Sequence, residues 1–190
     1  MEQGDGPGAL AAYQAGLTIA ESLAKSDPAN TRWQRDLSMS NNKIGDVLVA
    51  QGDGPGALAA YQAGLAIREG LAKRDPANTE WQRDLSVSNS KIGDVLVALG
   101  DGPGALAAYL AGLTIAEGLA NRNPANTGWQ VDVALSYARL GNLDSLLLIQ
   151  ERQEYLSKGL NLLTTLKQAG RLHANQDWTG WFENALRSLN

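Results

Sequence analysis

The sequence predicts an all-α protein, a right-handed solenoid of antiparallel helix hairpins with about eight helices. Three observations predict it. The chain repeats itself with a period of 48 residues, which is the spacing of Gly4, Gly52 and Gly100. Each period holds two runs with helical apolar spacing, and residues that start or stop helices bound each run. Self-similarity at a fixed period of this size is typical of stacked repeat proteins.

The period divides the chain into repeats 4–51, 52–99 and 100–148 and a degenerate capping repeat 149–190, so we expect a single array over 1–190. The first two copies differ at only eight positions, among them Ala20/Arg68, Met39/Val87 and Asn42/Ser90. Such near-identity indicates recent duplication or engineering, and the irregular last third favours a natural origin.

The first helix of each repeat is expected to follow a polar cap and to end at a glycine. In the second copy Asn78 or Thr79 can accept the unpaired amide hydrogens of the first turn. Gly100 ends that helix, because glycine tolerates the left-handed conformation at a helix end. One apolar stripe runs between these limits and is formed by Trp81, Leu85, Ile92 and Leu96. The stripe of the first copy, with Trp33, Leu37, Ile44 and Leu48, is equivalent, so we expect the tryptophans in the core.

The second helix of each repeat is expected to start at a proline and to stop before another. In the third copy Pro103 fits the first turn, where no amide hydrogen is needed, and Pro124 forbids continuation. Its apolar side consists of Leu106, Tyr109, Leu113, Ile115 and Leu119.

The run "GDGPG" between the helices could suggest a phosphate-binding loop. It follows a helix, however, and offers no lysine with a serine or threonine, so we interpret it as a helix stop, a turn and a helix start. A calcium loop is excluded too, because one aspartate cannot supply the six or more oxygens that calcium needs.

The stretch "KIGDVLVALGDGPGALAAYLAGL" resembles a tetratricopeptide repeat. The residues at that family's spacing are Gly93, Gly100, Ala105, Tyr109 and Gly112, with Gly45, Gly52, Ala57, Tyr61 and Gly64 one period earlier. The usual repeat has about 34 residues, so about 14 are extra here. The pattern formed by Ile67, Glu69 and Pro76 resembles the longer repeats of kinesin light chains. The run "WQRDLS" followed by "KIGDV" is similar to long bacterial repeats. The resemblance implies a helical protein-binding fold and names no ligand.

The last third departs from the pattern. We expect the helix from about 128 to run past Gly141, a break near 150–153, a helix to about 169 and a last one over 176–189. Trp178, Trp181 and Phe182 near the end could cap the array or contact a partner. At the other end the chain begins in mid-repeat, so the helix over 7–26 is expected to lack its hairpin partner.

Composition and residue chemistry argue against catalysis, metals and cofactors. The chain has no cysteine and one histidine, His173, which we place in a surface turn. Glu151 and Glu154 share a helix face that we interpret as solvated. A net charge of −4 argues against nucleic acid as a partner. No apolar run of about 18 residues and no leader is visible, so we expect a cytoplasmic protein without a membrane partner.

The face opposite the apolar stripe is the candidate peptide-binding groove, since first helices line the concave wall of such stacks. Its predicted members are Arg35, Met39, Asn42, Asp46, Val49, Arg83, Val87, Ser90, Asp94, Val97, Ala138 and Asn142, and Val131, Leu135 and Ser145 share the face. Rows of Arg, amide or hydroxyl, and Asp suit an extended peptide with a basic or mixed-charge segment. The alternative is a merely solvated face, and Asp84 and Lys91 are expected to meet charges on a neighbouring repeat.

A second function also fits the sequence. The chain is expected to self-associate as a homo-oligomer through its N-terminal helix, because Leu10, Tyr13, Leu17 and Leu23 would otherwise leave an apolar face in water. Under this alternative the protein is a structural assembly module rather than a scaffold that binds a protein or peptide ligand.

Overall fold

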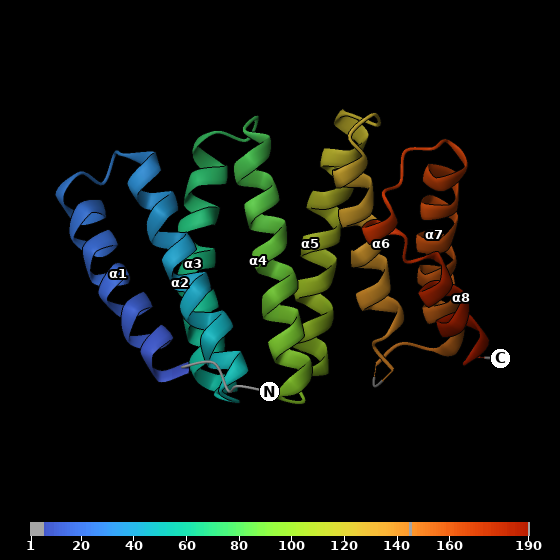
Figure 1. Cartoon of the computed structure of the whole chain (residues 1–190), viewed down its shortest axis with the longest axis horizontal. Helices are drawn as coiled ribbons and strands as arrows, with labels where there is room; N and C mark the ends of the chain where they lie inside the picture. The colour runs from blue at the N-terminus through green and yellow to red at the C-terminus, as the bar shows by residue number, and fades with distance from the viewer. Residues whose placement is uncertain (1–5, 145, 190) are drawn as a thin grey trace. The chain divides into compact units, whose positions relative to one another are not determined.

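The computed structural model describes residues 6–144 and 146–189, which form eight α-helices, one short 3-10 helix and no strand (Figure 1). The α-helices are α1 Gly6–Ser26, α2 Thr31–Ala50, α3 Gly54–Arg74, α4 Thr79–Ala98, α5 Gly102–Arg122, α6 Thr127–Gly141, α7 Ile149–Gln168 and α8 Thr179–Arg187. The 3-10 helix η1 spans Ala174–Gln176. Ser145 of the predicted groove lies outside the described residues.

The helices form two compact units, Met1–Asp101 with α1 to α4 and Gly102–Asn190 with α5 to α8. In each unit every helix packs against the next one along the chain, and consecutive helices run in opposite directions (Figure 1). This packing confirms the prediction of an all-α fold of stacked antiparallel hairpins with eight helices. That the whole chain acts as a single array stays a prediction.

The first helices of the repeats begin as the sequence predicts. The side-chain oxygens of Asn30, Asn78 and Asn126 accept a hydrogen bond from the backbone N–H three residues on, at 3.2, 3.1 and 3.1 Å. In each case the donor belongs to the repeat's tryptophan. These caps satisfy amide hydrogens that have no partner inside the helix.

The "GDGPG" turn ends one helix and caps the start of the next. Gly52 and Gly100 have φ angles of 78° and 81°, the left-handed region that glycine enters without strain. The Asp53 carboxylate then accepts from the Gly56 N–H at 2.9 Å and caps α3. The turn therefore joins two helices, as interpreted from the sequence, and its aspartate is engaged with its own backbone.

The core of the first unit is built from aliphatic residues and tyrosine. Ala57, Tyr61 and Leu71 of α3 are buried, and a Cβ at Gly45 of α2 would collide with the Tyr61 ring. The glycine therefore permits close approach of α2 and α3. Trp33 and Trp81 are only partly buried, so they lie at the edge of the core rather than inside it.

The core of the second unit contains a phenylalanine from the last helix. Phe182 of α8 is fully buried in a cluster with residues of α6 and α7, namely Val131, Ala134, Leu156, Leu163 and Leu166. The expectation that Val131 faces outward is therefore wrong. It is wrong because α8 supplies an aromatic cover for this part of α6, which a pattern in α6 alone does not reveal.

The predicted course of the last third needs a correction. Helix α6 ends at Gly141 instead of running on, and α7 begins at Ile149. Arg152 Nε donates to the Gly141 carbonyl at 2.9 Å and so satisfies the end of α6. The Leu148 N–H donates to Glu151 at 2.8 Å, so Glu151 caps the start of α7 and is at the same time exposed, as predicted. Glu154 is exposed and pairs with Lys158 at 2.7 Å.

The last helix begins at Thr179, three residues later than predicted. Asp177 holds that start, because its carboxylate accepts from the Thr179 hydroxyl at 2.6 Å and pairs with Lys167 at 2.7 Å. The hydrogen bonds from Lys167 and Thr179 lower the pKa of Asp177 to about 2. His173 is exposed in the preceding turn, as predicted.

Helix α5 is, among the described residues, the one helix long and apolar enough to cross a membrane. It packs against α6, and Leu113, Ala116 and Leu119 are buried. The core helix of a soluble protein meets the same criteria of length and composition.

Candidate functional site

Two polar residues of the predicted groove in the first unit are buried, and its apolar residues are exposed. Asn42 and Ser90 are buried, although the sequence places them on the outward face. The four apolar members are exposed, with between 39% and 49% of their surface open, and they are Met39 and Val49 of α2 and Val87 and Val97 of α4. We call these four the apolar rows, because Met39 and Val87 occupy one repeat position and Val49 and Val97 another.

The charged groove residues of α2 form ion pairs with charged side chains of α4, the equivalent helix one repeat further on. Arg35 Nε bonds Asp84 at 2.7 Å, and Arg35 Nη1 bonds Glu80 at 2.8 Å. The hydrogen bond to Asp84 raises the pKa of Arg35. This pairing confirms the prediction that Asp84 meets a charge on a neighbouring repeat.

A second pair links the other ends of the same two helices. Asp46 of α2 pairs with Lys91 of α4 and accepts a hydrogen bond from the Tyr61 hydroxyl at 2.7 Å. Burial and this bond raise the pKa of Tyr61 above its ordinary value, so the phenol stays neutral. The Lys91 ammonium also lies 5.3 Å from the centre of the Tyr61 ring, a cation–π geometry.

Arg68 of α3 lies beneath this face with only 5% of its surface exposed. Its Nε donates to Ser38 at 3.2 Å, and its Nη1 donates to the Asp84 carbonyl at 2.9 Å and to Ser88 at 2.6 Å. With its amide oxygen turned to the guanidinium, Asn42 accepts from Nη1 and Nη2 at 2.8 and 3.2 Å. Burial lowers the pKa of Arg68, and the Asp84 charge acts against that shift.

Arg68 therefore joins the middle of α2 to the middle of α4 through α3. The equivalent positions hold Ala20 and Ala116, so this link is specific to the second copy. The sequence reasoning missed its role, although the Ala20/Arg68 difference between near-identical copies was a usable signal.

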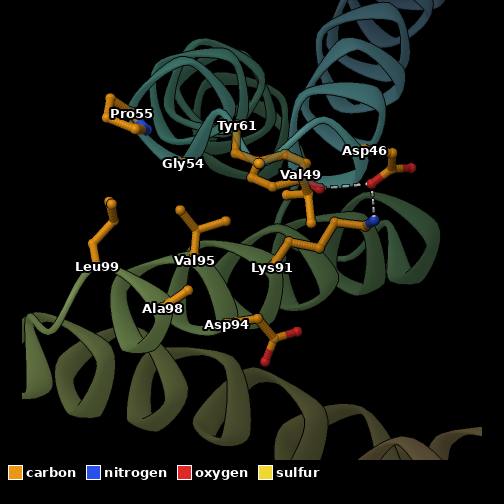
Figure 2. Close-up of a pocket in the computed structure, with 11 residues that line it drawn as sticks. Asp46, Val49, Gly54, Pro55, Tyr61, Lys91, Asp94, Val95, Ala98 and Leu99 are labelled. Atoms are coloured by element: carbon orange, nitrogen blue, oxygen red, sulfur yellow. Dashed lines mark hydrogen bonds and ion pairs between the residues drawn. The ribbon is translucent and has the colours of Figure 1, made fainter. Parts of the chain in front are cut away.

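A pocket of about 450 Å³ opens between the C-terminal ends of α2 and α4 (Figure 2). Three predicted groove residues line it, Asp46, Val49 and Asp94. The remaining wall is mostly apolar, with Pro55 and Tyr61 from α3 and Val95, Ala98 and Leu99 at the end of α4. Figure 2 shows Lys91 extended beside Tyr61 to Asp46, so the polar groups gather at one side of the pocket and Leu99 lies on the other.

The groove residues of the second unit lie in a different setting. Ala138 and Asn142 line a hollow of about 210 Å³ with Leu135 and Arg139 of α6. Its other wall is aromatic and consists of Trp178, Trp181 and Phe182. The two tryptophans are exposed and Phe182 is buried. Phe182 therefore covers the core, while Trp178 and Trp181 form an exposed aromatic surface.

The remaining predicted positions are Arg83 and Asp94, which are exposed and which both have interaction partners. Among the described residues no group of three or more histidine, aspartate or glutamate side chains is placed to hold a metal ion.

The fold is similar to that of a known repeat protein. BtubC (BKLC) from P. vanneervenii, a kinesin-light-chain-like tetratricopeptide repeat protein, superimposes with a TM-score of 0.52 at 15% sequence identity. The likeness covers 97% of this chain and 83% of BtubC. No protein-family model matches the sequence, and no curated protein matches it either. At this identity the likeness shows the fold, a tetratricopeptide-like helical repeat.

Proposed function

We propose that this protein is a non-catalytic scaffold that binds a segment of another protein on the face formed by α2 and α4. The observation that carries the proposal is the pocket of about 450 Å³ between these helices, which Val49 lines. Ligand pockets are mostly apolar with a few placed polar groups, and this one has that composition.

The apolar rows support binding over simple solvation. A face that only meets water has no need of apolar side chains at repeated, exposed positions. Here the charges of Arg35, Asp46 and Lys91 are partnered across the helices, and Met39, Val49, Val87 and Val97 are exposed on the same two helices, together with Arg83 and Asp94. In this proposal the ion pairs position the helices and the apolar rows contact the ligand.

The test begins with peptides selected by display against the whole protein. We expect the double variant Val49→Asp, Val97→Asp to bind the selected peptides about 10-fold more weakly or worse, a loss of about 1.4 kcal/mol. Leu110→Asp is the matched control, because Leu110 is an equally exposed apolar residue of α5, at 38%.

Circular dichroism melting shows whether both variants stay folded. If the double variant and Leu110→Asp bind the selected peptides as the parent does, the ligand does not lie on this face and the proposal fails.

The open face of α1 favours self-association as a second function. Helices α1 and α3 have nearly the same sequence, yet Tyr13 is 40% exposed where Tyr61 is 3% exposed. Ile19 and Leu23 of the same helix are exposed as well. In α3 the corresponding face is covered by α2. The same face of α1 is exposed and has the side chains that pack against a helix in α3.

Light scattering tests this second function over a range of concentrations. We expect an average mass above that of one chain at high concentration, and a return to the single-chain mass in Ile19→Asp. A monomeric parent protein at every concentration would remove this function and leave the α2/α4 proposal intact.

A further inference from the structure

We propose that the occupant of the α2/α4 face is an amphipathic helix that binds through apolar side chains three turns apart. The proposal rests on the function proposed above and specifies its ligand. It follows from the spacing of the apolar rows and from the hydrogen bonds that the polar side chains of this face already make.

The spacing gives the length of the contact. Met39 and Val49 are ten residues apart on α2, and Val87 and Val97 are ten apart on α4. At a rise of about 1.5 Å per residue the two rows are about 15 Å apart along the helices. On a ligand helix, residues i and i+11 are about 16 Å apart and share a face. One such side chain meets Met39 and Val87, and the other reaches Val49 and the pocket.

The hydrogen bonds argue for a helix rather than an extended peptide. An extended ligand brings unpaired backbone N–H and C=O groups that need partners. The polar side chains of this face have partners of their own, Arg35 with Asp84, Asp46 with Lys91, and Asn42 with Arg68. A helical ligand pairs its backbone N–H and C=O groups within itself, so the face needs to supply only apolar contacts.

The lining of the pocket indicates which kind of ligand side chain would be the anchor that it binds. Its volume of about 450 Å³ admits one large side chain, and Val49, Tyr61, Val95 and Leu99 offer it apolar surface. The Asp46 carboxylate at the polar side is neutralised by Lys91. An aliphatic or aromatic anchor therefore fits the pocket better than a charged one, and its binding depends little on salt, because an uncharged side chain has no charge for salt to screen.

The experiment uses two displayed peptide libraries on the whole protein. One has a helix-forming alanine, glutamate and lysine background with positions i, i+4, i+7 and i+11 randomised. The other carries proline at every third residue, which keeps it extended. We expect binders from the helical library, with Leu, Phe, Met or Trp enriched at i and i+11.

Those binders should lose about 10-fold or more in affinity with Val49→Asp, Val97→Asp, and little with Leu110→Asp. Their affinity should change less than about 2-fold between about 0.05 and 0.5 M salt.

Three results overturn the inference. If only the extended library yields binders and they respond to Val49→Asp, Val97→Asp, the face binds a protein segment but not a helix. If helical binders carry charged residues at i and i+11 and weaken steeply with salt, the anchors are not apolar. If no binder from either library responds to the double variant, the proposed function fails together with this inference.

Discussion

The outward face of the first helices differs between the two units, although it is built from the same repeat. On α2 and α4 charged side chains pair across the helices, and four apolar residues, Met39, Val49, Val87 and Val97, are exposed. On α6 the corresponding residues Val131, Leu135 and Ala138 are apolar, and α8 covers part of them with Phe182 while two tryptophans stay exposed. The repeat thus determines the helical backbone, and the neighbouring helices determine whether the side chain at each position is buried, paired or exposed.

One repeat position shows this most clearly. Asn42, Ser90 and Ala138 are equivalent in sequence. Asn42 bonds a buried arginine, Ser90 is buried, and Ala138 lines an aromatic hollow. The difference teaches that a row of equivalent residues in a repeat protein is not automatically a row of ligand contacts.

The largest expected effect tests whether α8 belongs to the core of the second unit. Phe182→Ala should cost about 3–5 kcal/mol of stability, the usual range for a fully buried aromatic residue. Chemical denaturation measures it, with Trp178→Ala as an exposed control that costs much less. A loss below about 1 kcal/mol would mean that α8 does not cover α6 as described.

The next effect concerns the tryptophans of the repeats. Trp81→Ala should cost about 2–3 kcal/mol, less than Phe182→Ala, because Trp81 is only partly buried. The same denaturation experiment checks it. A cost as large as that of Phe182→Ala would show that the tryptophans lie deeper in the first unit than the structure places them.

Arg68→Ala breaks the polar link under the binding face and leaves Ser38, Ser88 and Asn42 without their common donor. We expect a loss of about 1–3 kcal/mol, the usual cost of leaving buried polar groups unpaired. Arg74→Ala, on the exposed end of the same helix, is the matched control. Equal stability of the two variants would contradict the view that the first unit depends on this link.

The pair of Asp46 and Lys91 should contribute less, about 0.2–1 kcal/mol, because both side chains are partly exposed. A double-mutant cycle with Asp46→Asn and Lys91→Met measures the coupling, which should fall as salt rises. A coupling near zero at low salt would mean that this pair does not position α2 against α4.

The smallest effect concerns Asp177, before α8. Nuclear magnetic resonance titration should give this carboxyl a pKa of about 2. Because the folded pKa lies below the unfolded one, about 3.9, the stabilisation is complete above the unfolded value and disappears as the pH falls through the folded one. Lys167→Met should move the pKa up. An ordinary pKa in the parent protein would show that Lys167 and Thr179 do not hold this side chain.

Much of the fold follows from local signals in the sequence. The asparagine caps, the turn glycines and Pro103 each act on one helix end, so their effect can be predicted from the residues nearby. The end of α6 was misjudged because Arg152, eleven residues on, satisfies the Gly141 carbonyl. Val131 was placed outside for a similar reason, since Phe182 comes to it from 51 residues away.

The binding face was predicted less well than the fold. Helical periodicity assigned Arg35, Asn42 and Asp46 to one side of α2, but it could not show that Asp84, Arg68 and Lys91 reach them from other helices. A side chain's partner depends on the distance and angle between helices, and a single helix pattern contains neither. Whether these residues contact a ligand stays a prediction.

The central claim is that the apolar rows of α2 and α4 contact the ligand. Nuclear magnetic resonance of the protein with carbon-13 methyl groups on methionine and valine tests it most directly, by titration with a peptide selected on the whole protein. We expect the largest shift changes at Met39, Val49, Val87 and Val97, and little change at Val131 and Val133 in the second unit. Saturable binding that leaves all four of those methyl signals unmoved would contradict the claim.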